Sequence, residues 1–157
     1  MGRISVGNAA TNVELVYREQ APRLYRALLL YAGDREIASD AVAEAFAQAL
    51  RRGDAIRSLE RWIWKTAYRV AAGELDRRSV TGPTVETAYE IPETPLLLSV
   101  AMRELSPMQR ASVALHDFAG YKLREVAAIT GSTASAVSVH LVRAHRKLRR
   151  YLEVVDG

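Results

Sequence analysis

Cysteine is absent from the sequence, and long apolar runs are absent too. Without cysteine, neither a disulfide bond nor a thiolate metal site can hold the fold together, and the redox state of its compartment stays open. The runs "ALLLYA" and "PLLLSVAM" are far shorter than the roughly 18 residues that a membrane helix requires. The start, "MGRISVGNAATNVEL", has no apolar core of signal-peptide length. We therefore expect a cytoplasmic protein that does not insert into a membrane.

Motifs for catalysis and metal binding are missing as well. No glycine-rich motif is present to cradle a phosphate, and no nucleophile has an evident histidine partner. His140 and His145 are five residues apart, a spacing that places them poorly on one helix face for a shared metal ion. The sequence thus predicts no enzyme, no metal site and no cofactor.

The residues that are present are typical of a folded protein, with 49% apolar and 25% charged side chains among 157. The net charge of +4 is unevenly placed: residues 1–78 hold 13 basic and 10 acidic side chains, 79–102 three acids and no base, and 103–157 nine basic and five acidic. The acidic middle contains "SVTGPTVETAYEIPETP", with three prolines and no apolar period. This predicts a linker over 79–95 between an N-terminal domain, 1–78, and a C-terminal domain, 96–157.

Apolar residues recur at helical spacing on both sides of this linker, and no segment alternates with period two. We expect an all-α fold of two small helical domains joined by a flexible linker. Gly33 and Gly53 are expected to end helices, and Asp34 to cap the helix between them. In the helix that follows Ser58, the residues expected to face the core are Leu59, Trp62, Ile63, Thr66 and Val70.

The segment "LREVAAITGSTASAVSVHLVRAHRKL" has the layout of a helix-turn-helix. Gly131 stands where the turn needs a positive φ, and Ser132 or Thr133 is suited to cap the second helix. A plain helical hairpin with a solvated basic face would show the same periodicity. The five basic residues without an acid between 134 and 152 favour nucleic-acid binding. Upstream, Ser106 and Gln109 predict a capping box, and the inward stripe of the second helix is expected at Val137, Leu141, Ala144 and Leu148.

With both halves considered, the chain resembles the extracytoplasmic-function sigma factors, small promoter-recognition subunits of bacterial RNA polymerase. "LYRALLLYAGDREIASDAVAEAFAQAL" is similar to the family's helix pair, and "SLERWIWKTAYRVAAGELDRR" to its next helix. "LSPMQRASVALHDFAGYKLREVAAITG" is similar to the family's entry into its C-terminal helix-turn-helix. Both motif sets occur in the family's order, with a proline-containing linker between them.

The resemblance implies a sigma factor that directs promoter-specific transcription initiation. Its implied partners are core RNA polymerase, promoter DNA and an anti-sigma factor, and no cofactor is needed because the polymerase performs the chemistry. Asp40 and Glu44 lie one helical turn apart, so both carboxylates share a face. A solvated acidic pair is the alternative for such spacing. The polymerase-binding residues implied by the family's acidic pattern are Asp40, Glu44 and Phe46.

Trp64 and Tyr68 are four residues apart and interleaved with basic residues, a pattern suited to stacking on unpaired bases. The alternative is that both are core residues, but Trp62 and Ile63 already fill the expected buried stripe, which favours partial exposure of Trp64. The loop "RRGDAIRS" corresponds to the place where the family captures a flipped minus-10 base. The minus-10 residues implied by the resemblance are Arg57, Arg61, Trp64, Lys65, Tyr68 and Arg69.

The chain departs from the family at several positions. Family members usually carry basic residues where this chain has Ser138 and His140, and Asn and Asp where it has Arg69 and Gly73. These departures leave an alternative function open: a diverged sigma-like interaction protein, or a stand-alone helix-turn-helix regulator that has lost initiation activity. The minus-35 residues implied by the resemblance are Arg124, Ser135, Ser138, Val139, His140, Val142, Arg143, Arg146 and Lys147.

Overall fold

The structure, a computed structural model, describes residues 2–79 and 96–156. Apart from Ser79, the predicted linker lies outside the described residues. Within the described residues every regular element is helical and no strand occurs, which confirms the all-α prediction.

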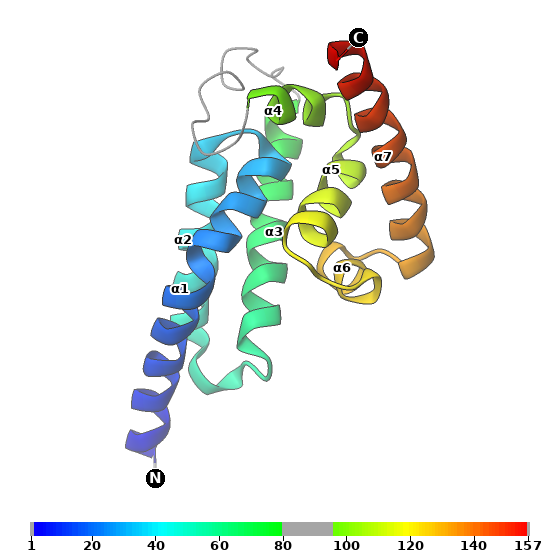
Figure 1. The fold of residues 1–157 in the computed structure, drawn as a ribbon. Coiled ribbons are helices and arrows are strands. Elements are labelled where there is room, and N and C mark those ends of the chain that lie inside the picture. Colours follow the sequence, from blue (N-terminus) through cyan, green and yellow to red (C-terminus); the bar gives the residue numbers. More distant parts are fainter. Residues whose placement is uncertain (1, 80–95, 157) are drawn as a thin grey trace.

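Three long helices form the N-terminal half: α1 (Gly2–Ala32), α2 (Arg35–Arg52) and α3 (Leu59–Ser79). They lie side by side, and a short 3₁₀ turn, η1 (Gly53–Ala55), joins α2 to the loop before α3 (Figure 1). The side chain of Asp34 accepts a hydrogen bond from the Ile37 backbone N–H at 3.0 Å. Asp34 therefore caps α2, as the sequence predicts.

The C-terminal half contains four shorter elements and one long helix. They are α4 (Leu96–Arg103), α5 (Pro107–Ser112), the π-helix η3 (Val113–Phe118), α6 (Leu123–Thr130) and α7 (Ala134–Asp156). The predicted capping box is present, because the Ser106 side chain accepts from Gln109 N and the Gln109 side chain from Ser106 N. The continuation of α5 as a π-helix was not predicted.

The helix-turn-helix of α6 and α7 forms as expected. Gly131 has φ 75°, the left-handed conformation that the turn requires, and its N–H bonds to the Ala127 carbonyl. The Thr133 hydroxyl accepts from Ala136 N at 3.1 Å and so caps α7. The predicted stripe faces inward: Val137, Leu141 and Ala144 are buried, and Leu148 packs against the core.

The two halves pack against each other, and their buried side chains form one continuous cluster. Helix α3 contacts α6, while α1 contacts α5 and η3 (Figure 1). Arg110 on α5 is half-buried at this junction and donates to the Tyr31 carbonyl of α1 at 2.9 Å. The boundary at 79–95 as a separation of two independently folded domains stays a prediction.

Helix α3 buries a different face from the one expected. Its fully buried side chains include Ile63, Trp64 and Tyr68, whereas Leu59, Trp62 and Val70 are only partly buried. Periodicity identifies the side of α3 that faces α1 and α2, but it takes no account of α6, which contacts α3 from the other half of the chain. The prediction that Trp64 is partly exposed is therefore wrong for this arrangement.

Candidate polymerase and nucleic-acid interface

The expected polymerase-binding residues lie on α2, but they do not share one environment. Asp40 is exposed and Glu44 is partly exposed, so both carboxylates reach the surface. Glu44 accepts hydrogen bonds from Gln48 at 2.9 Å and from Arg51 at 3.2 Å. The Gln48 hydrogen bond, followed by the Arg51 charge, lowers the pKa of Glu44, so its carboxylate is ionised at neutral pH.

Phe46, by contrast, is only 5% exposed and supports the surface from below. Its ring meets Tyr17 of α1 edge-on, with ring centroids 5.0 Å apart. Tyr17 is 52% exposed. The sequence reasoning missed Tyr17, since an aromatic residue four positions before an apolar run was assigned to no surface. It extends the α2 face with an apolar contact beside the acidic pair.

The basic residues expected at minus-10 DNA lie at the surface of the segment from Arg57 to Arg69. Arg57, Arg61 and Arg69 are exposed, and Lys65 is half-buried. The side chains thus present a row of cations. This is the arrangement that a nucleic-acid backbone requires.

The two aromatic residues of the same set are instead in the core. Trp64 is 1% exposed: its Nε1–H donates to Gln20 Oε1 at 3.3 Å, and its ring meets Tyr121 edge-on at 5.0 Å. Tyr68 lies 5.1 Å from the Tyr31 ring, and burial raises its pKa. Neither ring is open to a base in this arrangement, which corrects the expectation of exposed stacking surfaces.

Trp62 is the tryptophan that reaches the surface. It is partly buried, and the Arg52 guanidinium lies 5.5 Å from its ring centroid. This pair brackets the loop 53–58, which the resemblance assigns to capture of a flipped base. Trp62 was placed in the core by periodicity, so only the three-dimensional fold identifies it as a candidate contact.

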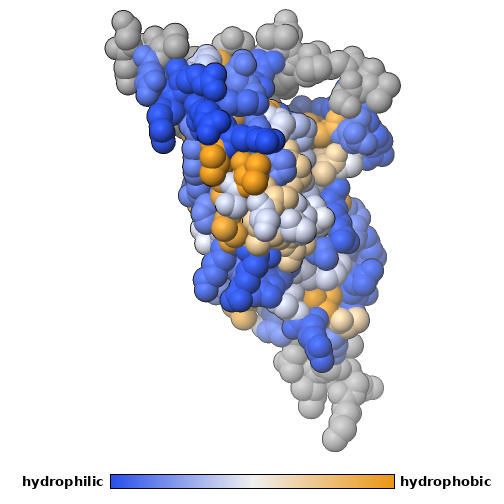
Figure 2. Space-filling model, turned by 90° about the vertical axis from the view of Figure 1, so that its right-hand side faces the viewer, coloured by the Kyte–Doolittle hydropathy of each residue, from blue (hydrophilic) through white to orange (hydrophobic). Residues whose placement is uncertain are grey.

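The expected minus-35 residues are spread over one side of the helix-turn-helix. Val139 and Val142 are 47% and 54% exposed, and Ser135, Arg143, Arg146 and Arg124 are exposed, while Ser138 and His140 are half-buried. Figure 2 shows the face of the molecule on the α7 side, where hydrophobic patches lie between hydrophilic margins. The geometry thus brings these residues to the surface, with exposed valines in the first half of α7 and basic residues after them.

Two members of the basic run have partners within the chain. Lys147 Nζ donates to Gln109 Oε1 at 3.0 Å, which ties α7 to the capping box of α5. His145 Nε2 lies 2.5 Å from Asp117 Oδ2. Lys147 was predicted as a DNA contact, but in this structure it also contributes to packing.

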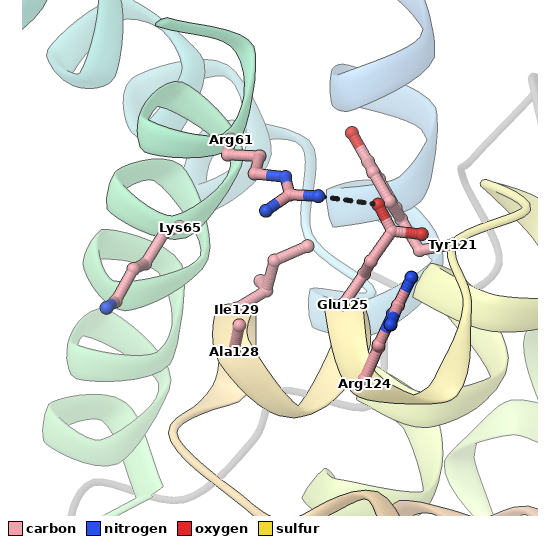
Figure 3. Close-up of a pocket in the computed structure, with 7 residues that line it drawn as sticks. All are labelled: Arg61, Lys65, Tyr121, Arg124, Glu125, Ala128 and Ile129. Carbon is pink, nitrogen blue, oxygen red and sulfur yellow. Dashed lines mark ion pairs between the residues drawn. The ribbon is translucent and has the colours of Figure 1, made fainter. Parts of the chain in front are cut away.

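A cleft between α3 and α6 brings the minus-10 and minus-35 sets together. It has a volume of about 460 Å³, and Arg61 reaches across it to Glu125, with Nη2 and Oε2 3.6 Å apart (Figure 3). Residues expected at two separate promoter elements thus face one another. The cleft is lined by Arg61, Lys65, Tyr121, Arg124, Glu125, Ala128 and Ile129.

Two searches of the described residues complete the surface. No group of three or more His, Asp or Glu residues in 2–79 and 96–156 is arranged to hold a metal ion. None of the helices in that part of the chain is long and apolar enough to cross a membrane.

Comparison with known proteins gives two kinds of match. The family model described as sigma-70, region 4 matches residues 96–148, the span that contains the helix-turn-helix. Along the whole chain, the sequence is 28% identical over 172 aligned positions to the ECF RNA polymerase sigma factor SigL of Mycobacterium tuberculosis, covering 98% of this chain and 97% of the relative.

Solved structures share the fold. The sigma factor RpoE, solved in complex with the anti-sigma factor NepR from Bartonella quintana, has a TM-score of 0.75 at 17% identity, covering 91% of this chain and 98% of that one. CnrH, solved in complex with the cytosolic domain of CnrY, has a TM-score of 0.72 at 20% identity, covering 97% of each chain. The sequence matches and this shared fold confirm the resemblance: the chain belongs to the extracytoplasmic-function sigma factor family of bacterial RNA polymerase.

Proposed function

We propose that the chain directs promoter-specific transcription initiation through two surfaces, one in each half. Residues 1–78 bind core RNA polymerase and the minus-10 element, and residues 96–157 bind the minus-35 element. The observation that supports this division most directly is the region 4 match over 96–148, which coincides with the helix-turn-helix and its exposed basic residues. The segment 79–95 connects the two.

At the minus-35 element, α7 enters the major groove with its N-terminal half. Ser135 and Ser138 are short donors and acceptors for base edges, and Val139 and Val142 supply apolar contacts for thymine methyl groups. Arg143 and Arg146 bind phosphates at the flank, with Arg124 from α6 on the other side of the turn. Because the reading part of α7 has no permanent charge, affinity comes mainly from the phosphate contacts.

At the minus-10 element, Arg57, Arg61, Lys65 and Arg69 hold the backbone of melted DNA. Trp62 and Arg52 flank the loop that receives a flipped base. Stacking by Trp64 or Tyr68 requires the C-terminal half to move, because Tyr121 covers Trp64 in this structure. The acidic face of Asp40 and Glu44, with Tyr17 beside it, binds a basic surface of core polymerase.

An anti-sigma factor is a further proposed partner, supported by the complex in which the similar fold of RpoE was solved. Sigma factors are in general non-enzymatic regulators, and we propose that this chain has no catalytic activity of its own. Since polymerase and promoter DNA are its partners, the proposed site of action is the bacterial cytoplasm.

The test is run-off transcription with purified core polymerase on a library of promoter fragments. Retention on core polymerase together with a defined start site is the expected result. A chain that binds DNA or a partner protein but directs no start site would instead be the diverged regulator, and the initiation proposal fails.

A further inference from the structure

Helix α6 and the residue before it cover the face of α3 that carries the expected minus-10 contacts. The Tyr121 ring lies edge-on against Trp64 at 5.0 Å, and its hydroxyl donates to Glu60 Oε1 at 3.3 Å. The Arg23 guanidinium of α1 lies 5.8 Å from the Trp64 ring centroid and 5.9 Å from that of Tyr121. Trp64 is thereby sealed between α1 and the C-terminal half.

Glu125 places a negative charge on the same face. Its Oε2 lies 3.6 Å from Arg61 Nη2, while its Oε1 accepts from the Lys122 backbone N–H at 3.0 Å. The second contact belongs to the capping box of α6 and fixes the carboxylate in position. Carboxylate and phosphate oxygens are both anionic acceptors that a guanidinium binds, so Glu125 fills the position that a DNA phosphate would take on Arg61.

We propose that α6, with Tyr121, is an intramolecular lid that closes the minus-10 face of the free chain, Glu125 replacing a phosphate on Arg61 and Tyr121 replacing a base on Trp64. The inference rests on the proposed function, because it assigns a regulation to that same face. Minus-10 DNA binds fully only after α6 leaves α3. Core polymerase or DNA therefore has to supply the free energy of opening.

The cleft beside this contact provides a place for a polyanion to begin the opening. Lys65 on α3 and Arg124 on α6 have no hydrogen-bond or ion-pair partner among the described residues. A strand that binds these two cations lies next to Arg61 and competes with Glu125 for it (Figure 3). The affinity measured on the free chain is then lowered by the fraction of molecules that are closed.

Glu125→Gln is the direct test, since it removes the charge but keeps an oxygen for the capping box. Glu104→Gln is its matched control: Glu104 is also exposed in the C-terminal half but lies outside the cleft. The binding of a labelled single-stranded 20-mer of mixed sequence is measured by fluorescence anisotropy on the full chain. Loss of one exposed ion pair predicts a gain in affinity of about two- to fivefold for Glu125→Gln, and none for Glu104→Gln.

Equal gains for the two variants would reflect general charge repulsion, and no gain for Glu125→Gln would mean that the ion pair does not restrain the chain. Either result overturns the lid. Acrylamide quenching of Trp64 gives a second readout, measured in a Trp62→Phe background where Trp64 is the single tryptophan. Quenching of Trp64 is expected to rise with Glu125→Gln and to stay at the parent value with Glu104→Gln.

A crosslink tests the lid without relying on affinity differences between variants. The chain has no cysteine, so Lys65→Cys with Ala128→Cys places two thiols on opposite walls of the cleft. A short thiol-specific crosslinker is expected to weaken single-stranded DNA binding at least about tenfold, relative to the same variant with both thiols capped separately. Equal binding by the two forms overturns the proposal.

These measurements are independent of initiation activity. Trp64 quenching uses the free chain without polymerase, so it tests the lid even if run-off transcription fails. Run-off transcription by the parent chain, in turn, tests the proposed function whatever the lid variants show.

Discussion

Trp64 stabilises the folded chain through contacts on every side of its ring. Its indole N–H bonds to Gln20, its ring meets Tyr121, and almost none of its surface reaches solvent. A buried tryptophan removes a large apolar area from water, and edge-to-face aromatic contacts add to that gain. Any role of this ring in DNA binding therefore competes with its role in packing.

Trp64→Ala is expected to lower the free energy of unfolding by about 3–5 kcal/mol, because it removes the buried ring and leaves a cavity. Trp62→Ala is the control, since that ring is only partly buried. Urea denaturation followed by circular dichroism measures both. Equal losses for the two variants would contradict the burial of Trp64. An impaired promoter opening in Trp64→Ala is interpretable only where the variant is folded.

Arg143 is exposed on α7 and is expected to hold a phosphate. Arg143→Ala should reduce the magnitude of the salt slope of duplex binding by about one, because one counterion-releasing contact is lost. Arg18→Ala on α1 is the control: Arg18 is also exposed, but it pairs with Glu14 far from the helix-turn-helix. Binding titrations at several salt concentrations measure the slope, and an unchanged slope removes Arg143 from the contacts.

At the scale of the elements, short-range chemistry decided most helix bounds, and these were predictable. Asp34, Ser106 and Thr133 each satisfy backbone N–H groups within three residues, so the sequence contains all the information needed. The orientation of α3 about its axis was not predictable. It depends on Tyr121, which lies 57 positions after Trp64, and a periodicity window does not reach that far. The exposed role of Trp62 was missed for the same reason.

Two glycines allow the turn of the helix-turn-helix to be tested by opposite effects. Gly131 has φ 75° and open space around its Cβ position, so Gly131→Ala suffers backbone strain alone, and stability should fall by about 1–2 kcal/mol. Gly73 lies inside α3, also without a neighbour within 4 Å of an added Cβ. Gly73→Ala should therefore raise stability by up to about 1 kcal/mol. Thermal and urea unfolding of both variants measure this. A change of the same sign in both would contradict the assigned backbone conformations.

At the scale of the whole molecule, the junction between the halves is rich in buried tyrosine. Tyr31 and Tyr68 pack together near Arg110 of α5, and Tyr121 packs on Trp64. Burial is the first cause of a raised pKa in all three tyrosines. The sequence predicted the elements on both sides of this junction but not their packing, because the contacts join residues 40 or more positions apart.

This junction predicts how stability depends on alkaline pH. The folded chain holds the three phenol protons more tightly than the unfolded chain, whose tyrosines ionise near pH 10. Stability from these groups is therefore fully present at pH 7–9 and falls as the pH rises above about 10, by up to about 1.4 kcal/mol per pH unit for each tyrosine. Few other groups contribute there, since only three of the 22 basic residues are lysine and arginine stays charged.

Urea denaturation at pH 8, 9, 10 and 10.5 measures the free energy of unfolding along this range. Tyr121→Phe keeps the ring on Trp64 but has no phenol proton, so its stability should decline less steeply above pH 10 than that of the parent. Tyr17→Phe is the control, because Tyr17 is half exposed and lies away from the junction. If Tyr121→Phe and the parent declined in parallel, Tyr121 would not be buried between the halves in solution, and α6 would not lie on α3 in the free chain.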